Sequence, residues 1–147
     1  MIRCAIVTAP IDPAALLAEV TTQATGATTL FIGTVRDVNE GRAVTGIEYS
    51  AYTAMALDEM ERIAQEASQR FDGSRVAIEH RIGVLLLQEI SVAIAVAHAR
   101  RAPAMDAGRY AIEELKRRVP VWKQEHYADG ERRWVDPTAV QSTGALP

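Results

Sequence analysis

The stretch LKRRVPVWKQEHYADG, from Leu115 to Gly130, places two lysines on either side of a proline. Lys116 lies in a basic run, and Lys123 follows a tryptophan that is expected to be anchored and so to fix the direction of the lysine. A lysine desolvated beside other cations has a lowered pKa, which is the usual way to make an amine a base or a nucleophile near neutral pH. The two lysines are therefore candidates for convergence on one anion.

Each lysine also has an explanation without chemistry. Cations in the last turn of a helix are stabilised by the helix dipole, by roughly 0.3–1 kcal/mol, which is enough to account for Lys116. Lys123 can form an ordinary surface salt bridge with Glu125, two positions further along. The residues alone leave both explanations open.

Arginines follow two predicted strands. Arg36 stands where the strand in FIGTVR ends, and the pair Arg100-Arg101 follows a second strand. Ligand contacts are common at such strand ends. Together with Lys116 these residues could build one phosphate pocket, because guanidinium groups bind phosphate through two parallel hydrogen bonds. Gly33, inside the first of these strands, predicts a bulge or a close backbone approach.

Patterns for metal or nucleophile chemistry are lacking. His80, His98 and His126 have no ligand spacing, and the first two lie in predicted strands. There is no glycine-rich phosphate loop. Cys4, the one cysteine, is expected to be a small core residue. The sequence therefore predicts neither a metal site nor a cofactor.

Composition narrows the class of protein. A chain of 147 residues fits one domain, and 48% hydrophobic with 24% charged residues is typical of a globular protein. No apolar run approaches the ~20 residues of a membrane span, and the N-terminus lacks the pattern of a signal peptide, so a cytoplasmic location is expected. Residues 100–133 hold nine Lys/Arg against six Asp/Glu in a chain of net charge −3. That local excess favours an anion site over a nucleic-acid surface.

The elements that must position these residues can be read from periodicity. Helical spacing runs from Ala56 to Phe71 and from Pro103 to about Arg118, where Pro120 should end the helix, and a short helix should follow Asp12. After Pro120 an irregular end is expected. The domain should cover residues 1–136, followed by a fraying tail over 137–147. The fold class is α+β, a single domain with a mixed or antiparallel sheet. The expected strands are Ile2–Val7, Thr28–Val35, Val44–Tyr49, Arg75–Ile82 and Ile90–His98.

The motifs taken together resemble a known family. FIGTVRDVNEGRAV, YSAYTAMA, IEHRIGVL, the block RRAPAMDAGRYAIEELKRRVPVWKQE and the final G-x-x-x-W-V, in this order from Thr28 to Val135, are similar to the large, catalytic subunit of molybdopterin synthase. The resemblance implies an α/β hammerhead-type fold and a homodimer of large subunits. It also implies a small ubiquitin-like partner, whose C-terminal Gly-Gly thiocarboxylate supplies the sulfur that converts cyclic pyranopterin monophosphate to the dithiolene of molybdopterin.

The resemblance also implies roles for individual residues. Lys116 and Lys123 match the two active-site lysines, and neither is expected to lie in the core. The matched substrate-binding residues are Thr34, Val35, Arg36, Arg100, Arg101, Lys116, Lys123, Gln124 and Glu125. Two positions depart from the family pattern. Arg100 replaces a histidine, which should preserve anion binding but not acid–base chemistry, and Ser50 stands where the family often has Glu. A non-catalytic, dimeric anion-binding module of the same fold is the alternative.

Overall fold

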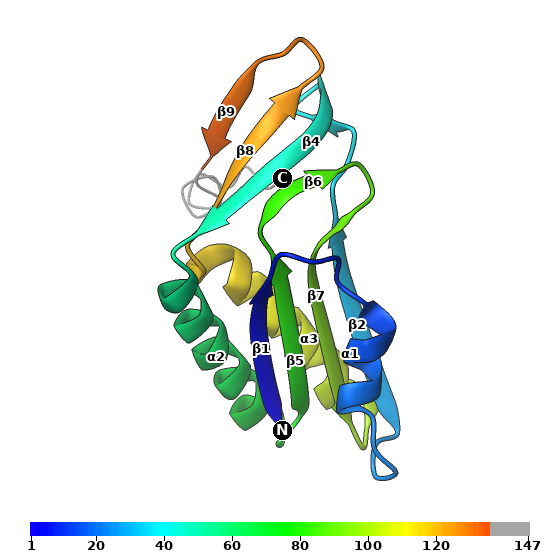
Figure 1. Cartoon of the computed structure of the whole chain (residues 1–147). Helices are drawn as coiled ribbons and strands as arrows, with labels where there is room; N and C mark the ends of the chain where they lie inside the picture. The colour runs from blue at the N-terminus through cyan, green and yellow to red at the C-terminus, as the bar shows by residue number, and fades with distance from the viewer. Residues whose placement is uncertain (136–147) are drawn as a thin grey trace.

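The computed structural model describes residues 1–135 and shows four strands side by side in a first sheet (Figure 1). Their order is β1 (Ile2–Val7), β5 (Arg75–Arg81), β7 (Ile90–His98) and β2 (Ala27–Thr34). β1 runs parallel to β5, while β5 and β2 are antiparallel to β7. β7 is buried from Ser91 to His98. Its apolar residues on both faces predict a central strand, and it lies between β5 and β2.

Helices cover both faces of this sheet. The short helix α1 (Pro13–Val20) packs Leu16 and Val20 on alanines of β5 and β7. The longer helices α2 (Thr53–Arg70) and α3 (Arg101–Arg118) lie on the opposite face and enclose the larger core (Figure 1). The Asp12 carboxylate caps α1 by accepting hydrogen bonds from the first backbone N–H groups, as predicted from the sequence.

A second sheet extends beyond one end of the first (Figure 1). It contains β3 (Val38–Asn39), β4 (Arg42–Ala51), β8 (Val121–Tyr127) and β9 (Arg132–Val135), in that order. The fifth strand, β6 (Gly83–Leu86), pairs with β4 from the other side. Because α3 ends where β8 begins, the last turn of the helix and the first residues of the strand lie at the junction between the two sheets.

Most of the predicted elements are confirmed, including the mixed sheet and the α+β class. The bulge predicted at Gly33 is present as a register shift between Gly33 and Thr34. A Cβ at Gly33 would come within 2.8 Å of Val92, so the close approach is real as well. Alternation along β5 predicts that Arg75, Ala77, Glu79 and Arg81 face solvent. This prediction is wrong in part, because Ala77 is buried under α1.

The irregular end predicted after Pro120 is wrong. Residues 121–127 form β8 and residues 132–135 form β9, which pair with each other. No helix among the described residues is long and apolar enough to cross a membrane. The cytoplasmic location stays a prediction, and the tail over 137–147 lies outside the described residues.

Candidate active site

Lys116 occupies the last turn of α3, next to the buried Leu115. The helix ends two residues later because Pro120 favours extended backbone at Val119, whose φ is −78° and ψ 123°. This stop directs the chain into β8 and sets Lys116 at the point where helix and strand meet. Lys116 is half-buried, so its position is more than that of a solvated residue at a helix end.

Lys123 lies on the inner face of β8. Val121, Lys123, Glu125 and Tyr127 alternate along the strand and are all buried, with Lys123 only 8% exposed. The expectation that neither lysine lies in the core is therefore wrong for Lys123. Trp122 points the other way and is 44% exposed in the chain, so the predicted anchoring of this tryptophan is also wrong. The strand pleat, rather than the indole, fixes the direction of Lys123.

The ion pair expected between Lys123 and Glu125 is present, but it is buried instead of superficial. The Lys123 Nζ lies 3.5 Å from the Glu125 Oε1, and the side chain of Glu125 is 2% exposed. The Tyr127 hydroxyl and the Asn39 amide donate to the same carboxylate, at 2.6 Å and at 2.8–2.9 Å. Burial raises the pKa of Glu125, but these hydrogen bonds and the charge of Lys123 outweigh it and leave the pKa lowered.

A cavity of about 210 Å³ opens over these residues. Lys116 enters it from α3, Lys123 from β8, and Arg36 from the segment after β2. An Arg36 Nη lies 3.4 Å from the Asn39 Oδ1, which links the exposed arginine to the amide that holds Glu125. The residues that line the cavity are Phe31, Gly33, Thr34, Arg36, Val38, Asn39, Val44, Ile47, Tyr49, Ser91, Lys116, Lys123 and Glu125.

The environment of the cavity changes the pKa of Lys116. Burial, followed by the charge of Lys123, lowers the pKa of Lys116 to about 8. A substantial share of Lys116 is then neutral amine near physiological pH, so its Nζ can accept a proton. The lowered pKa expected of a desolvated lysine is thus found at Lys116.

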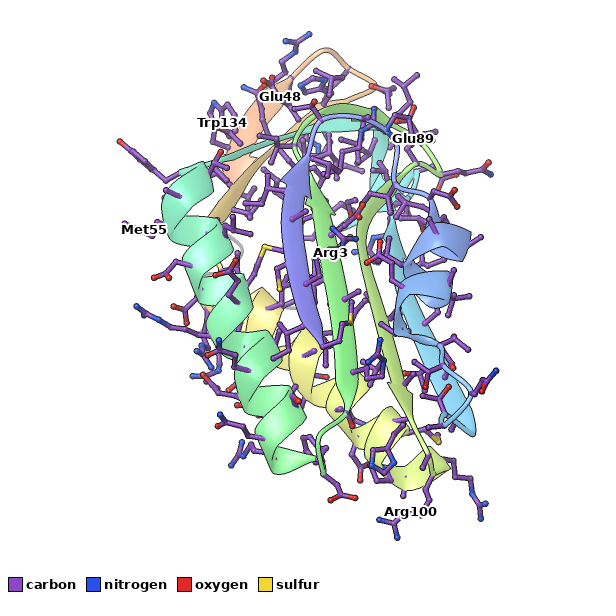
Figure 2. All side chains as sticks on the ribbon, turned by 60° about the horizontal axis from the view of Figure 1, so that its bottom comes forward. Arg3, Glu48, Met55, Glu89, Arg100 and Trp134 are labelled. Atoms are coloured by element: carbon purple, nitrogen blue, oxygen red, sulfur yellow. The ribbon has the colours of Figure 1, made fainter. Side chains whose placement is uncertain are left out.

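Several of the predicted residues do not reach the cavity within one chain. Arg100 and Arg101 begin α3, whereas Lys116 lies in the last turn of the same helix. Figure 2 shows Arg100 at the end of the molecule opposite to Glu48 and Trp134 of the second sheet. Helices rise about 1.5 Å per residue, which puts Arg101 some 20 Å or more from Lys116. A single chain therefore does not build the one pocket expected from all the basic strand ends.

The other two predicted contacts also lie outside the cavity. Gln124 lies on the outer face of β8, where its Oε1 is 3.1 Å from the His126 Nε2. Val35 is buried at 3% exposure, and its backbone hydrogen-bonds to the loop between β6 and β7. Val35 thus helps to hold Thr34 and Arg36 at the cavity rim without lining it.

Three polar residues of the cavity were not predicted from the sequence. Asn39, Tyr49 and Ser91 line it, and Asn39 holds the Glu125 carboxylate. The turn sequence DVNEG gave a signal for Asn39, because asparagine side chains often hydrogen-bond locally at such turns. Tyr49 and Ser91 lie inside strands, where nothing in the sequence separates a cavity residue from a core residue.

The histidines and the cysteine have other surroundings. His98 is buried and accepts from the Arg100 N–H at 3.0 Å, which supports the start of α3. Cys4 is half-buried in β1, and burial raises the pKa of its thiol to about 12. A thiol of that pKa is a poor nucleophile. Among residues 1–135, no group of three or more His, Cys, Asp or Glu could hold a metal ion.

Comparison with known proteins identifies a family for this chain. The sequence model of the family described as "MoaE protein" matches residues 6–118. The molybdopterin synthase catalytic subunit of Halalkalibacterium halodurans is 43% identical over 133 residues, which cover 90% of this chain and 85% of that protein. The crystal structure of molybdopterin synthase from Staphylococcus aureus superposes with a TM-score of 0.84 at 35% identity, over 88% of this chain and 94% of that one.

A third similar protein was solved as a complex. The chain from Helicobacter pylori is 22% identical, with a TM-score of 0.75 over 90% of this chain and 89% of that one, in a complex of subunits 1 and 2 of molybdopterin-converting factor. At that identity the likeness shows the fold alone. The family match and the first two relatives settle the assignment: the chain belongs to the MoaE family of molybdopterin synthase catalytic subunits, enzymes of molybdenum cofactor biosynthesis.

Proposed function

We propose that this chain transfers sulfur from the C-terminal thiocarboxylate of a small ubiquitin-like partner to cyclic pyranopterin monophosphate, forming the dithiolene of molybdopterin. The observation that carries the proposal is the meeting of Lys116 and Lys123, from different elements, in one cavity with Arg36 at its rim. Both the substrate phosphate and the thiocarboxylate are anions, and a cavity lined by three cations suits them.

The two lysines have different environments and take different roles in this proposal. Lys123 lies 3.5 Å from the buried Glu125 carboxylate, and this ion pair fixes the position of its Nζ at the cavity wall. A fixed ammonium stabilises the oxyanion that develops when the acyl group of the partner changes bonding. Lys116, with its pKa lowered to about 8, exchanges protons near neutral pH and acts as the acid–base group.

No cysteine of this chain lines the cavity, so the chain has no thiol there to supply sulfur. Cys4 is the one cysteine, and it lies in β1 of the first sheet with a raised pKa. The sulfur must therefore be brought in by another molecule. A partner tail ending in Gly-Gly is slender, because glycine has no side chain to clash with the cavity walls. The Helicobacter pylori complex of two subunits supports such a partner.

We further infer that the chain works as a homodimer, and as a heterotetramer with two partners. β2 is an edge strand, with β7 as its one neighbour among residues 1–135. Phe31 and Ile32 in β2 are 39% and 37% exposed, and an apolar groove between β2 and α3 adds the 60%-exposed Met105. An open, apolar strand edge is a favourable surface for pairing with a second copy.

Such a dimer would also complete the anion site. Ala27, at the start of β2, pairs with His98, so Arg100 and Arg101 lie beside the end of β2 that is remote from Thr34. In an antiparallel pairing of two β2 strands, the start of one strand lies beside the end of the other. The arginines of the second copy would then approach Thr34 and Arg36, which explains how Arg100 and Arg101 can serve a cavity from which they are distant in their own chain.

The experiment supplies the purified protein with cyclic pyranopterin monophosphate and a small partner that ends in either a thiocarboxylate or a carboxylate. The proposal predicts that the dithiolene forms with the thiocarboxylated partner, and that mass spectrometry finds the sulfur of the partner replaced by oxygen. No product should form with the carboxylated partner. Equal product from both partners, or none from either, would contradict the proposal.

A further inference from the structure

A second, smaller cavity lies behind the two lysines. Its volume is about 20 Å³, enough for one water molecule. It shares Tyr49, Lys116 and Lys123 with the larger cavity, so the two adjoin. Its remaining polar wall is His80, and Leu115, Val119 and Val121 close its apolar side. We call this smaller cavity the rear chamber.

His80 comes from β5 and is 2% exposed. Its Nδ1 lies 2.9 Å from the Arg81 carbonyl oxygen. Because a carbonyl can only accept, Nδ1 carries the ring proton and Nε2 keeps its lone pair. The ring packs edge-on against Tyr49, with centroids 5.3 Å apart, which fixes its orientation. The Nε2 has no hydrogen-bond partner among residues 1–135. It does not belong to the fully buried unpartnered atoms of that range, so it keeps some accessible surface, and the ring lines a chamber of water size.

The charges around the chamber keep His80 neutral. Burial, followed by the charge of Lys116, lowers the pKa of His80 to about 4. The other titratable groups that face the chamber are Lys116 from α3, Lys123 from β8 and the phenol of Tyr49 from β4. A protonated imidazole would be a third cation here and would have no lone pair to offer. The neutral ring can accept a hydrogen bond from water at Nε2 at any pH above about 5.

The proposed function requires a water that can reach the acyl carbon of the partner. When the thiocarboxylate sulfur replaces an oxygen substituent on a substrate carbon, a C–S bond forms and the C–O bond breaks with its electron pair on oxygen. The partner tail is then joined to the substrate through an acyl thioester. To release the tail as a carboxylate, a water oxygen must bond to the acyl carbon, and the acyl C–S bond must break with its electron pair on sulfur. Two protons leave the water: one goes to the neutral amine of Lys116 and the other to solvent. No oxidant or reductant is needed.

We propose that the rear chamber holds this hydrolytic water and that His80 positions it through Nε2. The inference rests on the proposed function, and it adds a step and a residue to it. His80 orients the water lone pair toward the acyl carbon, and Lys116 takes the proton as the bond forms. Core residues form the apolar wall of the chamber, and Lys116 and Lys123 line both the chamber and the larger cavity, so a water in the chamber lies next to the two lysines.

The test follows one turnover by intact mass spectrometry of the partner. His80→Phe keeps an aromatic ring against Tyr49 but removes the Nε2 acceptor. Val121→Leu fills the chamber from its apolar side and leaves every polar group in place. Both variants should form the covalent partner–substrate adduct at the wild-type rate and hydrolyse it about 10–100-fold more slowly, since loss of an oriented reactant costs factors of this size. The adduct should therefore accumulate.

Two further variants separate positioning from structure. His80→Gln places an amide oxygen near the position of Nε2 and should restore part of the hydrolysis rate. Val76→Leu makes the same enlargement in the same core, four residues along β5 from His80, and should leave both rates unchanged. Thermal unfolding of each variant establishes that it is folded, and Val121→Leu decides the question if His80→Phe does not fold.

The outcomes are distinct. Accumulated adduct in His80→Phe and Val121→Leu supports the inference. Hydrolysis at the wild-type rate in both, or an equal slowing of adduct formation and hydrolysis, overturns it while the proposed function stands. A wild-type protein that forms neither adduct nor dithiolene overturns the proposed function and this inference together.

Discussion

The ammonium of Lys123 lies 3.5 Å from the carboxylate of Glu125, two residues further along the same strand, and both side chains are buried. The carboxylate is held in turn by Tyr127 and Asn39. Removing one member of a buried pair leaves the other charge uncompensated, so such pairs are kept where the charge has a use. Here the pair holds the Lys123 ammonium at the cavity wall beside Lys116. The lowered pKa is that of Lys116.

The first prediction concerns the pH dependence of catalysis. If neutral Lys116 is the base, kcat/KM should rise with pH and reach half its maximum near pH 8, the pKa that burial and Lys123 give to Lys116 in the free protein. Below that pH the ammonium predominates and cannot accept a proton. The measurement is kcat/KM from pH 6 to 10. A fall through pH 8 would mean that the charged form of Lys116 is the active one.

Much of the first sheet could be predicted from the sequence because its burial follows apolar periodicity. β7 is apolar from Val92 to Ala97, and α2 and α3 repeat apolar residues every three or four positions. β8 escaped prediction because its inner face carries Lys123 and Glu125 in place of apolar residues. The charged residues that serve the site break the apolar alternation that would have predicted the strand. For the same reason Lys123 was expected to lie outside the core.

Part of the site could not be predicted for a different reason. The family pattern matched Lys116, Lys123 and Arg36, and these three residues line one cavity. It could not show that Arg100 and Arg101 lie the length of α3 away from Lys116. Local sequence patterns do not give the order of strands in a sheet. His80 and Tyr49 form contacts only across strands, so their neighbours became known from the fold alone.

A second prediction concerns acid stability. The pKa of His80 is lowered to about 4 in the folded protein, against 6.5 for an unperturbed histidine. Between these values the unfolded chain binds a proton that the folded chain does not, so stability falls as pH falls from 6.5 to 4, by about 3 kcal/mol. Urea unfolding of the wild type and of His80→Gln at pH 4.5 and pH 7 measures this loss in the free energy of unfolding. Equal losses in both proteins would show that His80 is not the group responsible.

A third prediction tests whether the anion site is shared between two chains. Lys116→Ala and Arg101→Ala homodimers should both be impaired. If Arg101 serves the cavity of the second chain, mixing and subunit exchange should restore roughly a quarter of the wild-type activity, because half the dimers are mixed and each mixed dimer has one intact site. If Arg101 served its own chain, the mixture would gain nothing over the separate variants. Sedimentation of the wild type as a monomer would rule out the shared site.

A fourth prediction addresses Arg100, which stands where the family pattern has histidine. Arg100 is exposed and lies 3.3 Å from Asp72, so its guanidinium can reach an anion from the surface. Arg100→Ala should raise KM more than it lowers kcat, the result expected when binding is lost equally from ground and transition states. Arg100→His should retain wild-type activity at pH 6 and bind substrate more weakly at pH 8, where histidine is neutral. A large fall in kcat at unchanged KM in Arg100→Ala would place the residue in the chemical step.

The central claim is that Lys116 and Lys123 together carry out the sulfur transfer, and single-turnover transfer by their methionine variants tests it most directly. Methionine preserves most of the side-chain volume, and the matched control is Arg117→Ala, which removes an exposed cation from the same helical turn. Thermal unfolding verifies that all three proteins are folded. We predict that Lys116→Met and Lys123→Met each slow transfer at least about 100-fold, in the range of general acid–base and oxyanion effects, and that Arg117→Ala transfers sulfur at the wild-type rate. Transfer at the wild-type rate in either folded methionine variant would contradict the account.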